Sequence, residues 1–172
     1  ILISYKTLNK DNPKLNCRLK NMEKFSPKRI VLDNSLQTNT RSYLFQTADK
    51  KNTIIFYNEA NKSKILEFKK KKIEIIKSKL NKDKTFDILF VLKKLYILGC
   101  RNILIEGGNK LTKNFLSKKL FNLFYLFKSP RKLSKLIEFK EFNGLNLLKK
   151  NYKKKSKVSS NFGKDLITLY KN

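Results

Sequence analysis

The stretch that decides the fold is Asn102–Leu111, which reads NILIEGGNKL. Its apolar run ends at Glu106, and Gly107 and Gly108 follow before a segment with helical spacing begins. Such a run predicts a strand, a turn and a helix. Ligands of open α/β sheets bind beyond the carboxyl ends of the strands. The junction therefore predicts either a ligand site or an ordinary turn capped by an acid.

Three properties of this junction favour a ligand site, and the last of them, the start of a helix, suits a phosphate group. Glu106 would emerge at the end of the strand, while Gly107 and Gly108 would let the backbone approach a ligand without an intervening Cβ. A helix that begins near Asn109 would point free N–H groups and its positive dipole end at the same space. A single Glu-Gly-Gly is a weak motif, so both interpretations stay open on these residues alone.

The chain up to residue 120 alternates short apolar runs with longer segments of helical spacing. Brief β-branched runs predict strands at 1–4, 29–33, 53–57, 73–77 and 102–108. Apolar residues at helical spacing predict helices at 61–70, 85–98 and 109–120. This alternation indicates a mainly parallel sheet with crossover helices. The all-apolar run at 102–108 is typical of a central strand covered on both faces.

The last third of the chain has a different pattern. Apolar runs there predict antiparallel strands at 121–127, 135–139, 145–158 and 165–170, with a turn at 159–164. Lysines along 149–157 are expected to edge the sheet, where they discourage pairing with other chains. We find no internal repeat and no linker, and 172 residues are enough for one domain. The predicted fold is therefore a single mixed α/β domain over residues 1–172.

The net charge of +28 arises from 41 basic and 13 acidic residues, and only five of the basic residues are Arg. Abundant Lys, Asn, Ile and Phe with two Ala are what an A+T-rich coding sequence would specify. A dedicated nucleic-acid-binding protein would use more Arg for bidentate contacts. Non-specific binding of nucleic acid is still expected at low salt. A basic nucleic-acid-binding module stays an alternative function.

Several residue types are scarce enough to exclude classes of site. The chain has no His and two distant cysteines, Cys17 and Cys100, which argues against a zinc site, histidine acid–base chemistry and a disulfide framework. We expect a reducing, cytoplasmic location. No apolar run approaches the ~20 residues of a membrane-spanning helix. The sequence starts inside a predicted strand, so we expect it to be the C-terminal part of a longer protein.

A second segment, TLNKDNPKLNCR at Thr7–Arg18, follows the first predicted strand directly. Asn12-Pro13 restricts the backbone to an extended or turning conformation. Asp11 and Arg18 flank that turn and could face one cleft as an acceptor and a guanidinium. Taken alone, the segment predicts an ordinary surface loop.

Taken together, these segments resemble the reductase domain of the bifunctional riboflavin-biosynthesis deaminase/reductase, which has a dihydrofolate-reductase-like fold. Four blocks in the same order carry the resemblance: the loop Thr7–Arg18, PKRIVLD at Pro27–Asp33, NILIEGGNKLTKNFL at Asn102–Leu116, and KSPRKL at Lys128–Leu133. The resemblance covers about residues 1–133 well and the tail loosely. Because several spaced blocks match, it is more specific than any one motif.

The resemblance implies roles for named positions. The positions implied to contact NADPH are Thr7, Asp11, Asn34, Gly107, Gly108, Asn109, Lys110, Leu111, Thr112, Lys113 and Asn114. The positions implied to contact substrate are Leu15, Arg18 and Glu106. Arg18 would hold the ribose phosphate through its planar guanidinium. Asp11 is also our candidate catalytic residue, as a group that orients the reactants or assists proton movement.

The implied reaction is hydride transfer from NADPH to the ribose C1′ of 5-amino-6-(5-phosphoribosylamino)uracil, which becomes the ribityl form. A same-fold reductase acting on a pterin or another carbonyl compound stays a second alternative, because one fold hosts several activities. The resemblance also implies a homodimer or higher homo-oligomer. In the family an upstream segment supplies a further strand, a helix and ligand contacts, and a zinc-dependent deaminase domain precedes it. We therefore expect this fragment alone to bind NADPH weakly and to be inactive.

Overall fold

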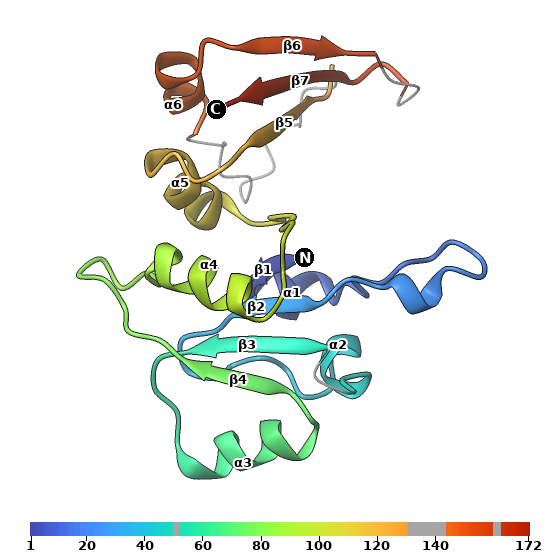
Figure 1. Cartoon of the computed structure of the whole chain (residues 1–172), viewed down its shortest axis with the longest axis vertical. Coiled ribbons are helices and arrows are strands. Elements are labelled where there is room, and N and C mark those ends of the chain that lie inside the picture. Colours follow the sequence, from blue (N-terminus) through green and yellow to red (C-terminus); the bar gives the residue numbers. More distant parts are fainter. Residues whose placement is uncertain (50–51, 131–143, 160–162) are drawn as a thin grey trace. The chain divides into compact units, whose positions relative to one another are not determined.

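The computed structural model describes residues 1–49, 52–130, 144–159 and 163–172. They form two compact units, Ile1–Gly108 and Asn109–Asn172. Each unit has its own sheet, with strand order β1-β2-β3-β4 in the first and β5-β7-β6 in the second (Figure 1). No helix of the described residues is long and apolar enough to cross a membrane. Whether the two units act as one domain stays a prediction.

The elements of the first unit, in chain order, are β1 (Leu2–Ser4), α1 (Tyr5–Asp11), the 3-10 helix η1 (Glu23–Phe25), β2 (Arg29–Leu32), α2 (Tyr43–Gln46), β3 (Thr53–Tyr57), α3 (Lys62–Lys70), β4 (Glu74–Lys77) and α4 (Ile88–Ile97). The elements of the second unit are α5 (Asn109–Ser117), β5 (Leu123–Lys128), α6 (Leu145–Asn151), β6 (Lys155–Val158) and β7 (Leu166–Lys171).

One face of the first sheet carries a core built by the three helices that connect its strands. Ile3, Val31 and Ile55 are paired across β1, β2 and β3, so their side chains share this face. They belong to one buried cluster with Leu8 of α1, Leu44 and Phe45 of α2, and Phe68 of α3. The rings of Phe45 and Phe68 meet edge to face, with centroids 5.0 Å apart. The predicted parallel sheet with crossover helices is confirmed.

The opposite face of this sheet is also apolar and buried, as Leu2, Ile30 and Ile54 show. The connections from β1 to β4 advance across the sheet in one direction, whereas the chain after β4 returns toward β1 through α4. Right-handed crossovers therefore place α4 on the face opposite to α1, α2 and α3. The buried residues of α4, which are Ile88, Val91 and Leu95, are apolar, as expected of a helix that covers an apolar face of the sheet.

The predicted strand at 102–108 forms only a short parallel bridge beside β1. The N–H of Leu2 donates to the carbonyl of Leu104 at 2.8 Å, and the N–H of Glu106 donates to the carbonyl of Leu2 at 3.0 Å. The expected central, fully covered position is wrong for the described residues, because Leu104 is 56% exposed. β1 pairs over all three of its residues with β2, whereas on this side only the bridge between Leu2 and Ile105 forms.

Most predicted elements of the first unit are confirmed. The runs at 1–4, 29–33, 53–57 and 73–77 form β1 to β4, and the segments at 61–70 and 85–98 contain α3 and α4. Asn61 and Asp87 cap the two helices, since their side-chain oxygens accept from Lys64 N and Leu89 N respectively. Gly99, at φ +83°, follows α4 as expected of a helix stop.

The interpretation of Thr7–Arg18 as a loop throughout is wrong at its start. Helix α1 takes up residues 5–11, with the Ser4 hydroxyl accepting from the N–H of Thr7 at 3.3 Å. Leu8 is its one buried residue, so the segment has no apolar stripe from which a helix could be predicted.

The second unit packs a helix pair against an antiparallel sheet. The predicted strands at 121–127 and 165–170 correspond to β5 and β7, and the helix predicted at 109–120 corresponds to α5. The strand predicted at 145–158 is wrong, because 145–151 is helix α6 and only 155–158 is strand. Leu148 and Tyr152, four residues apart, reach one buried cluster with Leu116 and Tyr170, which favours helical spacing. The predicted strand at 135–139 lies outside the described residues.

The lysine-rich strand β6 lies at an edge of the second sheet. Lys155 and Lys157 are exposed there. The prediction for the lysines of 149–157 is therefore confirmed for Lys155 and Lys157, whose charge discourages pairing of this edge with another strand. It is wrong for Lys149 and Lys150, which lie in helix α6.

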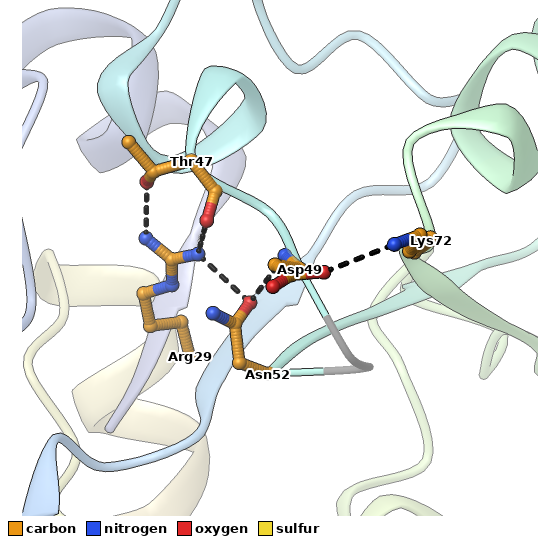
Figure 2. A network of polar contacts seen from close by, with 5 residues as sticks. All are labelled: Arg29, Thr47, Asp49, Asn52 and Lys72. Atoms are coloured by element: carbon orange, nitrogen blue, oxygen red, sulfur yellow. Dashed lines mark hydrogen bonds and ion pairs between the residues drawn. The ribbon is translucent and has the colours of Figure 1, made fainter. Parts of the chain in front are cut away.

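A buried arginine ties the start of β2 to the connection between α2 and β3 (Figure 2). Arg29 is 5% exposed, and it donates to Thr47 Oγ1 at 2.8 Å, to Thr47 O at 3.0 Å and to Asn52 Oδ1 at 2.9 Å. Its Nε has no hydrogen-bond partner, and burial lowers the pKa of the guanidinium from its ordinary value. Asp49 also contacts Asn52 and pairs with Lys72 at 3.3 Å between exposed side chains.

Replacing Arg29 with Ala should lower the free energy of unfolding by about 2–3 kcal/mol, because Thr47 and Asn52 lose a donor and buried volume is lost. Arg29→Met should cost less, since it keeps an apolar stem and removes a buried charge. Lys20→Ala, at an exposed position, should change stability by less than about 0.5 kcal/mol. Urea unfolding with a shared m-value measures all three. A loss for Arg29→Ala no larger than that for Lys20→Ala would contradict the structural role.

Candidate active site

The strand order of the first unit creates a switch point beside β1. The chain advances from β1 to β4 and then returns to the other side of β1, where Ile105 bridges to Leu2. In open α/β sheets, ligands bind at such a reversal, outside the carboxyl ends of the two neighbouring strands. Here those two ends are Ser4 and Glu106. The switch point therefore brings together the two segments that the sequence analysis selected independently.

One side of this candidate site is helix α1, which begins directly after β1. Thr7 and Asp11 are four residues apart in the helix, so their side chains share a face. The Thr7 hydroxyl lies 3.0 Å from the Ser4 hydroxyl, which orients it at the first turn. Asp11 is the exposed last residue, and Asn12, at φ +43°, ends the helix. The two residues implied to contact NADPH are thus presented by one short helix.

Asn34 is positioned by the end of β2. Its carbonyl accepts from the N–H of Asn58 at 2.9 Å and of Glu59 at 3.0 Å, which fixes its backbone to the end of β3. Its side chain is half-buried. The candidate cofactor position therefore lies at the carboxyl edge of the sheet, as the resemblance implies.

Asp33, directly before Asn34, is a fully buried carboxylate that the sequence analysis did not select as a site residue. It accepts from the N–H of Gln37 at 2.8 Å and from the N–H and hydroxyl of Thr38 at 2.7 and 2.8 Å. These three donors fold the residues after β2 into a tight loop. An Asp between a buried strand and a polar segment was the available signal, because such residues fold local turns.

The substrate positions of the first unit differ in exposure. Leu15 has φ +50°, and its side chain packs in the core of the first sheet at 9% exposure. The part of Leu15 that a ligand could contact is therefore small. A left-handed leucine costs roughly 1 kcal/mol, and such strain is more frequent at functional sites. Arg18 and Glu106 are exposed, so both charged groups are accessible to a solute.

The glycines after Glu106 are both exposed. A Cβ added to Gly108 would meet nothing within 4 Å, and φ of Gly108 is not in the left-handed region. The fold itself therefore does not require glycine at this position. This observation favours the hypothesis that a ligand approaches the backbone here.

The remaining implied cofactor positions, Asn109–Asn114, form the first six residues of α5 in the second unit. Lys110 and Lys113 are exposed, whereas Asn109, Leu111, Thr112 and Asn114 are half-buried. The helix is anchored by Phe115 and Leu116, which are buried. Within the described ranges, no group of three His, Cys, Asp or Glu side chains is placed to hold a metal ion.

The chain is similar in sequence to two riboflavin biosynthesis proteins. The chain is 26% identical over 171 residues to the riboflavin biosynthesis protein RibD of Aquifex aeolicus, covering 99% of this chain and 46% of the relative. It is 28% identical over 176 residues to RibD of Actinobacillus pleuropneumoniae, covering 99% of this chain and 45% of the relative. The chain thus spans less than half the length of these relatives.

Solved structures support the fold. RibD of Acinetobacter baumannii superposes with a TM-score of 0.68 at 17% identity, over 99% of this chain and 46% of that one. A pyrimidine reductase-like protein of Corynebacterium diphtheriae superposes with a TM-score of 0.72 at 17% identity, over 99% of this chain and 74% of that one. The predicted reductase-type α/β fold is confirmed.

The family model of the RibD C-terminal domain matches residues 1–166. This match covers all four sequence blocks and the switch point beside β1. The chain therefore belongs to the RibD C-terminal domain family.

Proposed function

We propose that this chain is the C-terminal part of the reductase domain of a riboflavin-biosynthesis enzyme, and that the intact protein, with the upstream segment included, reduces 5-amino-6-(5-phosphoribosylamino)uracil with NADPH. The observation that carries the proposal is the pairing of Glu106 with β1. The bond from Glu106 N to Leu2 O sets an exposed acid beside the helix that bears Thr7 and Asp11. Family membership supplies the reaction class.

The residues present fit a dinucleotide. Thr7 and Asp11 offer a hydroxyl and a carboxylate on one face of α1, and Asn34 adds an amide from the next strand end. The open space at Gly108 would admit a ligand close to the backbone. NADPH, when bound, supplies the hydride that reduces C1′ of the ribose. The chain's own residues then bind, orient and exclude water.

The substrate is held by groups of complementary charge in this proposal. Arg18 would bind the ribose phosphate in a bidentate pair. Glu106 would accept hydrogen bonds from the hydroxyl or amino groups of the substrate. Reduction consumes one proton in addition to the hydride, and we assign Asp11 to orient or deliver it, because it is exposed at the end of α1.

The comparisons do not support the alternative functions, a nucleic-acid-binding module and a same-fold reductase of pterins. The lysine-rich surface still predicts non-specific binding of polyanions at low salt. A homodimer or higher homo-oligomer and a cytoplasmic location also stay predictions.

Replacing Glu106 with Gln should raise KM for the pyrimidine substrate about tenfold or more, because hydrogen bonds to a charged acceptor contribute roughly 1.5–3 kcal/mol. KM for NADPH should change less than about twofold, since Glu106 is assigned to the substrate. NADPH oxidation by the intact protein measures both constants. Glu67→Gln, an exposed acid of α3, is the matched control. Equal effects of the two variants would remove Glu106 from the site.

Replacing Asp11 with Asn should lower kcat about tenfold or more, because general acid–base assistance contributes roughly 10²–10⁴-fold. Asp165→Asn, at an exposed position of the second unit, should leave kcat unchanged. Steady-state turnover of the intact protein at saturating substrate and cofactor measures the effect. Unchanged turnover in Asp11→Asn would show that Asp11 has no catalytic role.

Replacing Gly108 with Ala should weaken NADPH binding about tenfold while it changes the free energy of unfolding by less than about 1 kcal/mol, since the fold leaves room for a Cβ. Gly99→Ala should do the opposite, because φ of +83° strains any L side chain. Titration of NADPH and urea unfolding separate the two effects. Normal NADPH affinity in Gly108→Ala would contradict close approach of the cofactor at this glycine.

A further inference from the structure

A single side chain links α1 to the loop that follows β2. Nδ2 of Asn9 donates to the carbonyl of Gln37 at 2.9 Å, and Oδ1 of Asn9 accepts from the N–H of Asn39 at 2.9 Å. The amide group of Asn9 therefore holds two backbone positions that lie 28 and 30 residues further along the chain. Asn9 lies within the block Thr7–Arg18, but it is not among the positions implied to contact cofactor or substrate.

The loop that Asn9 holds is already rigid on its inner side. The carboxylate of Asp33 accepts hydrogen bonds from Gln37 and Thr38, and Asp33 is completely buried. Leu36 has φ +52° with its side chain at 1% exposure in the core. Residues 33–39 thus form one block, and this block carries Asn34, whose carbonyl is fixed to the end of β3.

Helix α1, by contrast, depends on tertiary contacts for its orientation. It has seven residues and one buried side chain, Leu8, and isolated helices of that length are unstable in water. Asn9 lies between Thr7 and Asp11 in this helix. An exposed pair of hydrogen bonds adds little to global stability, but it restricts the rotation of a short helix whose apolar contacts with the core are those of Leu8 and the half-buried Tyr5.

We propose that Asn9 is a positioning residue that sets α1 against the loop 33–39 and so holds Thr7, Asp11 and Asn34 in the arrangement that binds NADPH. This inference rests on the proposed function, since those three residues are its cofactor positions. A misplacement of about 1 Å in such a set is enough to lose much of the binding or rate. Asn9 acts through these residues and is not itself assigned to the ligand.

The test compares Asn9→Ala and Asn9→Asp with Asn61→Ala in the intact protein. Asn61 caps α3 through Lys64 N at 2.8 Å, so its loss removes a similar surface bond away from the site. Asn9→Asp keeps an acceptor for Asn39 N–H and loses the donor to Gln37. The measurements are the Kd for NADPH, KM for the pyrimidine, Tm, and hydrogen exchange of residues 33–39.

Asn9→Ala should weaken NADPH binding about tenfold, which corresponds to about 1.4 kcal/mol, with KM for the pyrimidine changed less than about twofold. Asn39 N–H should exchange faster, while Thr38 N–H, held by Asp33, should keep its protection. Asn9→Asp should also bind NADPH more weakly than the unchanged protein. Asn61→Ala should lower Tm without changing the Kd for NADPH.

Three results would overturn the inference, and they differ from one another. Normal NADPH affinity in Asn9→Ala, with faster exchange at Asn39, would show that the link exists but does not position the site. Equal losses of affinity in Asn9→Ala and Asn61→Ala would show a general effect of stability. Absence of NADPH binding by the unchanged protein would remove the proposed function and the positioning role together, and that result is visible before any variant is made.

Discussion

The two backbone hydrogen bonds of Leu2 determine where the candidate active site lies in this chain. They join β1 to a segment about a hundred residues later, through Leu104 O and Glu106 N. The strands β1 to β4 advance in one direction, so only this return pairing produces a reversal of strand order. Because the reversal leaves the carboxyl ends of two neighbouring strands beside each other, Glu106 and the start of α1 share one edge of the sheet.

The residues around that edge are held by polar contacts and by the apolar packing of side chains beneath them. Asp33 is a buried carboxylate satisfied by three local donors, and burial without such donors would be costly. Leu15 and Leu36 adopt left-handed backbone conformations because their side chains are held in the core. The loops that bear the candidate ligand contacts are therefore fixed in shape from beneath, while their outer atoms stay accessible.

The sequence predicted strands well where a short apolar run is buried along nearly its whole length. Residues 29–33 and 53–57 are buried on both faces, and they form β2 and β3 as expected. Helix α1 was missed because Leu8 alone is buried there. Helix α6 was mistaken for a strand, because lysines surround its apolar residues and hide their spacing. The candidate site was predictable in its residue types, whereas Asp33, Asn9 and Arg29 were not distinguishable from ordinary polar residues.

By itself, the sequence determined the parallel sheet of the first unit, the family, and the positions that resemble cofactor and substrate contacts. It could do so because periodic burial and short motifs are local properties of the chain. Only the tertiary structure decided which of those positions become neighbours. The links of Asn9 to Gln37 and Asn39, and of Arg29 to Thr47, join residues 18 to 30 positions apart. Such contacts depend on how strands and crossovers pack, and no local pattern encodes them.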